Sequence, residues 1–152
     1  GFLGLNKPVD ADVKGGKAEG VDEKYFLKAM NLTEADVVSA SIDGNKYTVK
    51  IKKTITPDAN SALAHATNDY ITFAEVNKSI NEAVGSAVVV EESGSKAIYD
   101  NIVFTATVVD GKLTNLEYSY TFSATLAIKL AIIKATGTGE AEITGTYSNI
   151  AY

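Results

Sequence analysis

The residues that most often carry enzyme chemistry are scarce in this chain of 152 residues. His65 is the only histidine, and the chain has neither cysteine nor arginine. It therefore lacks thiolate nucleophiles, sites built from several histidines and guanidinium clamps. The residues around His65 form no nucleophile pattern, and no serine lies in a Gly-x-Ser-x-Gly elbow. We expect a surface or loop histidine and no catalytic residue.

Two aspartates, Asp10 and Asp12, begin a segment that is similar to a calcium-binding loop. Lys14 stands where the loop needs a third oxygen ligand, and Val21 stands where it needs the bidentate glutamate. A cation bound there would have too few oxygen ligands. We expect neither a metal nor any other cofactor.

Paired carboxylates are the remaining route to chemistry, since a glycosidase needs only two acids at a suitable spacing. Glu91 with Glu92, and Glu140 with Glu142, are such pairs. Both pairs fall at edge-like ends of predicted strands, where charged side chains are common. We expect solvated edge residues and a protein that is not an enzyme.

The charge of the chain argues against nucleic acid as a partner. All 14 cationic side chains are lysine and the formal net charge is −5, whereas nucleic-acid recognition relies on a basic surface rich in arginine. No apolar run approaches the roughly 18 residues of a membrane-spanning helix. The most apolar window, residues 126–133, contains Lys129 and is typical of a strand. We expect no transmembrane segment.

Aromatic side chains form the candidate site with the clearest pattern. Tyr118, Tyr120 and Phe122 alternate along one predicted strand, and two more aromatics fall on matching faces of its neighbours. A buried tyrosine hydroxyl needs a hydrogen-bonding partner, which is easier to supply beside water or a ligand than in a dry core. The alternative is that these side chains simply pack as a core. The predicted cavity is lined by Tyr47, Phe104, Tyr118, Tyr120, Phe122, Phe73 and Ile80.

Residues 116–130 are the stretch around which the predicted fold is organised. Apolar and polar residues alternate from Leu116 to Leu130, which is typical of a half-buried strand. Such a strand would reach roughly 50 Å, whereas a compact domain of this length has a radius of gyration of about 15 Å. We therefore expect the strand to bend and its sheet to curve strongly.

A hairpin is predicted over residues 38–51. Gly44-Asn45 is a two-residue turn signal. Closing the chain there sets Ile42 opposite Tyr47, and it places the apolar residues of both strands on one face.

A second hairpin turns at Asp110-Gly111. In an unbroken register this turn would set Phe104 opposite Glu117. We infer an extra residue near Thr114 and Asn115, because a bulge there restores an apolar partner to the buried face.

Residues 73–84 carry the clearest helix signals. Thr72 and Glu75 form a capping box, and Gly85 follows the last turn. The apolar residues fall on one side only, so we expect this helix to lie across the concave face of the sheet. Residues 58–69 are expected to form a loop or one weak helix.

The predicted fold is α+β, and it forms a single domain over residues 1–152. It is a strongly curved antiparallel meander of about six strands packed on the helix at residues 73–84. A short N-terminal helix is expected at residues 23–30, and residues 1–20 are expected to form a loose arm. The last hairpin is expected to turn within residues 131–139.

The order of a helix, a hairpin, a capped helix and a meander of long strands resembles the curved half-barrel of bacterial lipoprotein-carrier domains, of the lipoprotein-localisation-factor type. Exported Firmicutes domains without an assigned function are also similar in their C-terminal halves. That similarity rests on Tyr99-Asp100-Asn101-Ile102, Asp110-Gly111-Lys112-Leu113 and Tyr118-Ser119-Tyr120. The resemblance extends over about residues 35–150. The carrier resemblance implies a cavity for an apolar ligand.

Two functions are expected from these observations. The first is a non-enzymatic extracytoplasmic module that holds an apolar small molecule or lipid between the curved sheet and the helix. The alternative is a structural or adhesion module of a bacterial cell-surface protein, with a filled core and a surface protein as partner. The chain begins with Gly1 and is rich in Thr, Ser, Tyr and Ala, which favours a secreted or surface-anchored protein whose leader has been removed.

Overall fold

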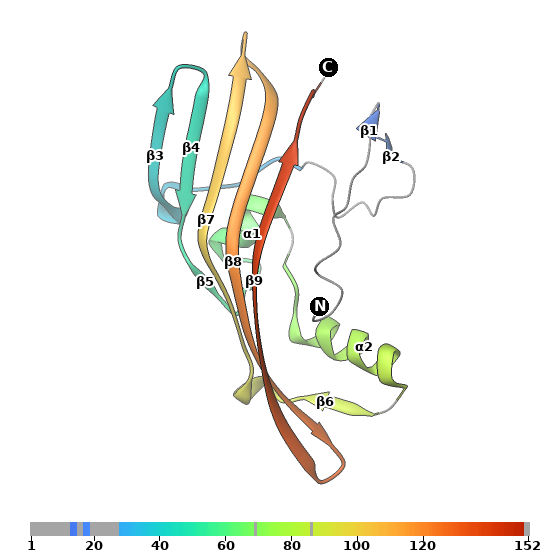
Figure 1. Ribbon diagram of the computed structural model, residues 1–152. Helices are drawn as coiled ribbons and strands as arrows, with labels where there is room; N and C mark the ends of the chain where they lie inside the picture. Colours follow the sequence, from blue (N-terminus) through green and yellow to red (C-terminus); the bar gives the residue numbers. More distant parts are fainter. Residues whose placement is uncertain (1–12, 15–16, 19–27, 69, 86, 151–152) are drawn as a thin grey trace.

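The computed structural model describes residues 13–14, 17–18, 28–68, 70–85 and 87–150 (Figure 1). Most of the calcium-like segment at residues 10–21, including Asp10, Asp12 and Val21, lies outside these ranges, as does most of the predicted helix at residues 23–30. Residues 28–30 are not helical. Within the predicted arm, β1 (Val13–Lys14) and β2 (Lys17–Ala18) pair as antiparallel strands.

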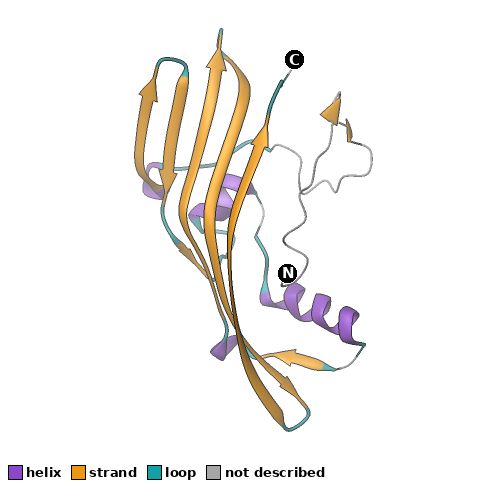
Figure 2. Cartoon of the chain, in the orientation of Figure 1, coloured by secondary structure: helices purple, strands orange, loops and turns teal. Residues whose placement is uncertain are grey.

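The rest of the described chain is built around an antiparallel sheet of seven strands, and the fold is α+β. β5 continues the line of β4 beside β7, and β6 precedes β7 along the same edge of β8. Across the sheet, β3 is followed by β4 with β5, then by β6 with β7, then by β8 and β9. The sheet is open, with β3 and β9 as its outer strands (Figure 2). The strands are β3 (Val37–Asp43), β4 (Lys46–Ile51), β5 (Thr54–Ile55), β6 (Val88–Val90), β7 (Lys96–Val109), β8 (Lys112–Leu130) and β9 (Ile133–Tyr147).

Both predicted hairpin registers are confirmed. The hairpin of β3 and β4 turns at Gly44-Asn45 in the expected register. In the hairpin of β7 and β8, Phe104 lies opposite Tyr118, because Thr114 is an extra residue between paired positions of β8. The Thr114 hydroxyl donates to the carbonyl of Thr107 at 3.2 Å, and so bridges the two strands at the predicted bulge.

A second bulge, in β7, does not follow from the alternation pattern. Asn101 and Ile102 of β7 lie opposite the single residue Tyr120 of β8. Asn101 has a φ of 52°, a left-handed conformation that asparagine tolerates better than most residues. The bulge reverses the alternation, so Tyr99 shares the buried face with Ile102, whose side chain is 1% exposed.

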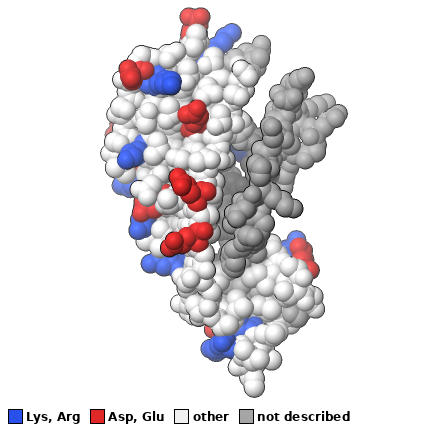
Figure 3. All heavy atoms as spheres, in the orientation of Figure 1, with Lys and Arg blue, Asp and Glu red and all other residues white. Residues whose placement is uncertain are grey.

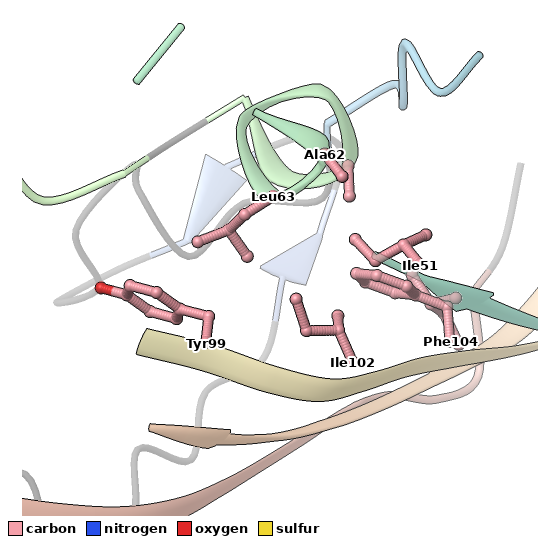
Figure 4. Packing of buried hydrophobic residues seen from close by; sticks show 8 residues of the cluster. Ile51, Ala62, Leu63, Tyr99, Ile102 and Phe104 are labelled. Atoms are coloured by element: carbon pink, nitrogen blue, oxygen red, sulfur yellow. The ribbon is translucent and has the colours of Figure 1, made fainter. Parts of the chain in front are cut away.

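The helix that covers the centre of the sheet is α1 (Ala62–Thr67), which the sequence predicts only as a loop or weak helix. The Ser61 side chain accepts a hydrogen bond from the N–H of Ala64, and Asn68 ends the helix with a φ of 53°. Leu63 and two alanines of α1 pack on the sheet as part of one buried cluster (Figure 4). We call the sheet face under α1 the inner face. The buried cluster consists of Ile51, Ala62, Leu63, Ala66, Tyr99, Ile102, Phe104 and Leu116.

The second helix, α2 (Phe73–Val84), has the predicted bounds and capping box but not the predicted position. None of its residues is buried, and its main contact with the sheet is the short strand β6. The Asn81 amide binds the carbonyl and N–H of Val88 at 2.9 and 2.7 Å, and Asn77 accepts from the N–H of Val90 at 2.8 Å. The prediction that this helix crosses the face of the sheet is therefore corrected. It lies beside β6 because its asparagines bind the backbone of that strand.

Leu63→Ala is expected to lower the free energy of unfolding by about 2–5 kcal/mol, because it leaves a cavity in the core under α1. Val84→Ala, at the exposed end of α2, is the control and should change the free energy by less than about 1 kcal/mol. Urea denaturation measures both changes. Equal losses in the two variants would contradict the role of α1 as the cover of the core.

Candidate functional site

The aromatic residues predicted on β7 and β8 lie together on the inner face. Phe104 and Tyr118 are cross-strand partners with ring centres 6.1 Å apart, and Tyr118 stacks on Tyr120 at 6.3 Å. Tyr120 and Phe122 contact Tyr99, with ring centres 5.7 and 5.0 Å away. We call these side chains the aromatic row. Tyr99 is absent from the predicted lining because the bulge in β7 hides its place in the alternation.

The other predicted lining residues lie on other elements. Tyr47 is on β4, where it is exposed and pairs with Ala106 of β7. Phe73 and Ile80 are half-buried on α2, whose main contact with the sheet is β6. The structure thus brings together the residues predicted on β7 and β8. Tyr47 lies one inner-face position further along the sheet, since its neighbour Val49 is the partner of Phe104, and the two residues of α2 lie beside β6.

β9 packs against one side of the aromatic row. Gly145 is the cross-strand partner of Tyr118, and a Cβ added to Gly145 would fall on the Tyr118 ring. The ring thus lies over the backbone of β9, where glycine leaves the room it needs. Burial raises the pKa of the nearby Tyr147 hydroxyl, and Tyr118 raises it further. The Tyr147 hydroxyl therefore stays protonated at neutral pH.

The face of the sheet opposite α1, here the outer face, carries an open depression of about 230 Å³. Glu117 is the only carboxylate among the residues that line it, so the depression does not provide the two acids that glycoside hydrolysis needs. It also lies on the face away from α1, whereas the predicted apolar cavity is expected between the sheet and a helix. The lining consists of Val103, Thr105, Glu117, Tyr118, Ser119, Thr144, Gly145 and Thr146.

The single histidine, expected on the surface or in a loop, joins two elements instead. His65 lies half-buried on α1, and its Nδ1 is 2.9 Å from Oδ2 of Asp36. The same carboxylate oxygen accepts hydrogen bonds from the N–H and the hydroxyl of Thr33, at 2.8 and 2.9 Å. These bonds connect α1 to η3 (Glu34–Asp36), the turn that leads into β3.

Hydrogen bonds stabilise the charged form of the Asp36 carboxyl. The backbone N–H of Thr33 has the largest effect and lowers the pKa of Asp36, while burial acts in the opposite direction. His65 and the Thr33 hydroxyl lower this pKa further. Because the carboxylate binds both its own turn and α1, we assign the Asp36–His65 pair a structural role.

No group of three or more histidine, cysteine, aspartate or glutamate side chains is arranged to hold a metal ion within the described residues. In the same ranges, no helix combines the length and the apolar character needed to cross a membrane.

Gly145→Ala is expected to destabilise the protein by about 1–3 kcal/mol, because the new methyl group displaces the Tyr118 ring. Gly137→Ala, on the same strand, places its methyl group where nothing lies within 4 Å. This control should be neutral or stabilising by up to about 1 kcal/mol. Thermal denaturation compares the two. A Gly145→Ala variant as stable as the wild type would show that the Tyr118 ring moves aside freely.

Asp36→Asn is expected to remove a pH-dependent part of the stability. Because folding lowers the pKa of Asp36, its contribution is present above the unfolded value of about 3.9 and is lost as the pH falls through the folded value. The difference in unfolding free energy between wild type and variant should be largest at about pH 5–7 and shrink below about pH 4.

Denaturant titrations over this pH range measure the effect of Asp36→Asn. Glu34→Gln, which alters an exposed acid in the same turn, is the control. A difference between wild type and Asp36→Asn that stays constant down to about pH 2 would contradict the assignment.

Comparison with known proteins finds no matching family model, no matching curated protein and no matching solved structure. The function is therefore inferred from the arrangement of the described residues.

Proposed function

We propose that this chain is a non-enzymatic, extracytoplasmic module of a bacterial cell-surface protein that acts by contact, as a structural or adhesion domain. The observation that carries this proposal is that the aromatic row belongs to the packing under α1, with two of its five side chains buried and the other three half-buried against the same core. Tyr99 and Phe104 are buried, and Leu63 and Ala66 of α1 belong to the same buried cluster. Aromatic side chains used in this way build a core rather than a ligand pocket.

The glutamates that the sequence offered as possible catalytic pairs do not line the depression described above. Glu91 is 3.2 Å from Lys134. Glu140 and Glu142 are exposed on β9, an outer strand of the sheet. His65 on α1 is paired with the carboxylate of Asp36 in η3, the turn before β3. These arrangements favour a module without a reaction centre.

The outer face of β8 and β9 offers a surface for contact with a partner protein. Short hydroxyl side chains dominate it, and such side chains adapt their hydrogen bonds readily at interfaces. Figure 3 shows acidic and basic side chains interspersed over the visible face rather than gathered by sign, which favours a polar protein partner over nucleic acid. The hydroxyl residues are Ser119, Thr121, Ser123, Thr125, Thr136, Thr138, Thr144 and Thr146.

A second function, binding of an apolar small molecule or lipid, is favoured by α2. Phe73, Val76 and Ile80 form its apolar stripe and are only half-buried. A ligand held between α2 and a strongly curved inner face would cover this stripe. The resemblance to lipoprotein-carrier domains implies such a site.

Native mass spectrometry of the protein purified from its own host distinguishes the two functions. For a structural or adhesion module we expect the mass of the chain alone, because the aromatic row then serves only to pack the core under α1. A bound lipid that is lost in Phe73→Gln but retained in Lys78→Gln, an exposed position on the same helix, would overturn this proposal and support the carrier function.

A further inference from the structure

The hairpin between β8 and β9 ends in an apolar tip. Its turn residues are Ala131 and Ile132, at the start of the predicted window of residues 131–139, and the last cross-strand pair before them is Leu130 with Ile133. The exposed fraction is 43% for Leu130, 66% for Ile133 and 95% for Ile132. Figure 1 shows the hairpin extending beyond β6 and α2 at one end of the sheet.

This turn departs from the chemistry of the other hairpin turns in the sheet. Those turns are Gly44-Asn45 and Asp110-Gly111, whose residue types favour tight turns. Ala131 has a φ of 54°, a left-handed conformation that is unfavourable for alanine. Ile132 in addition exposes a large apolar side chain to water. Asparagine and glycine would relieve both penalties, so the geometry of the turn does not explain the apolar tip.

Two lysines stand directly behind the apolar tip. Lys129 and Lys134 are cross-strand partners in the rung next to the last apolar pair, and like charges in this arrangement destabilise a strand pair. Lys134 is 3.2 Å from Glu91, which lies farther from the tip because its N–H binds the carbonyl of Ala127. From the end of the hairpin inward, the order is apolar, cationic and then anionic.

We propose that the hairpin tip, residues 129–134, inserts into the interface of a membrane that contains anionic lipids. A strand rises about 3.3 Å per residue, so Ile132 lies roughly 7–10 Å beyond the lysines. Amphipathic surface elements enter the boundary between headgroups and acyl chains to a similar depth, about 5–10 Å. At that depth the two ammonium groups reach the lipid phosphates.

The charge of the chain selects this partner and this orientation. With a formal net charge of −5, most of the surface is repelled by an anionic membrane, which favours end-on contact through the lysine-flanked tip. Docking of the tip on the tip of a second copy would bring both lysine pairs together, and the resulting repulsion opposes it. This contact goes beyond the proposed function because it adds a lipid surface as a partner.

Co-sedimentation of the full chain with vesicles tests the proposal. Vesicles of phosphatidylcholine with about one quarter phosphatidylglycerol are expected to pellet the wild type. Ile132→Asp should weaken this binding at least about tenfold, because it places a charge on the inserted side chain. Ile42→Asp is the matched control and should bind like the wild type, since Ile42 is 67% exposed but belongs to the hairpin at the other end of the sheet (Figure 1).

The lysines are tested by the double variant Lys129→Gln, Lys134→Gln. It is expected to bind the anionic vesicles about 25-fold more weakly, at about fivefold per lysine, and to bind phosphatidylcholine vesicles as the wild type does. Failure of the wild type to bind anionic vesicles, or equal binding by Ile132→Asp, would overturn the proposal.

A tryptophan at the tip reports its depth directly. The chain contains no tryptophan, so Ile132→Trp carries a single fluorescent probe. Its emission should move to shorter wavelength with anionic vesicles and be quenched by brominated lipid, whereas Ile42→Trp should show neither change. Sedimentation velocity without lipid tests whether the tip instead binds a second copy of the chain. A dimer that Ile132→Asp dissociates, together with absent vesicle binding, would replace the membrane with a homotypic contact.

Discussion

The fold depends on the contact between one short helix and the inner face of a much longer sheet. α1 spans Ala62–Thr67, whereas β8 alone spans Lys112–Leu130, so the helix shields only the middle of the strands. Dry packing is concentrated there, around Ile102. At the two ends of the sheet, Ile42 and Ile133 are exposed to water, although Val88, Val90 and Leu126 are buried near β6.

The parts of this fold that can be predicted from the sequence are those specified by residues close together in the chain. The turn at Gly44-Asn45, the capping box of α2 and the bulge at Thr114 are of this kind. α1 is not, because its alanines carry little amphipathic signal and Leu63 is its one large apolar residue. The bulge at Asn101 cannot be predicted from the sequence either. The alternation changes phase after Tyr99, and a strand that simply began after Asn101 would give the same pattern.

The candidate site shows the same division between local and distant signals. Tyr118 and Phe122 are predictable members of the aromatic row because they follow the alternation of β8. The pairing of Asp36 with His65 is not predictable, since no local pattern links a turn before β3 to a helix after β5. The position of α2 is mispredicted for a chemical reason. Asn77 and Asn81 are polar residues of the kind that usually face solvent, but their side chains bind the backbone of β6.

The placement of both helices between β5 and β6 divides the folding of the chain into an early and a late step. β7, β8 and β9 pair with their neighbours in the chain, so their loops close at little entropic cost. β4 pairs with β7 only after the whole helical connection has closed, which costs more chain entropy. The three C-terminal strands are therefore the natural folding nucleus, and the hairpin of β3 and β4 docks on them afterwards. In the native state that hairpin is the unit expected to open first in hydrogen exchange.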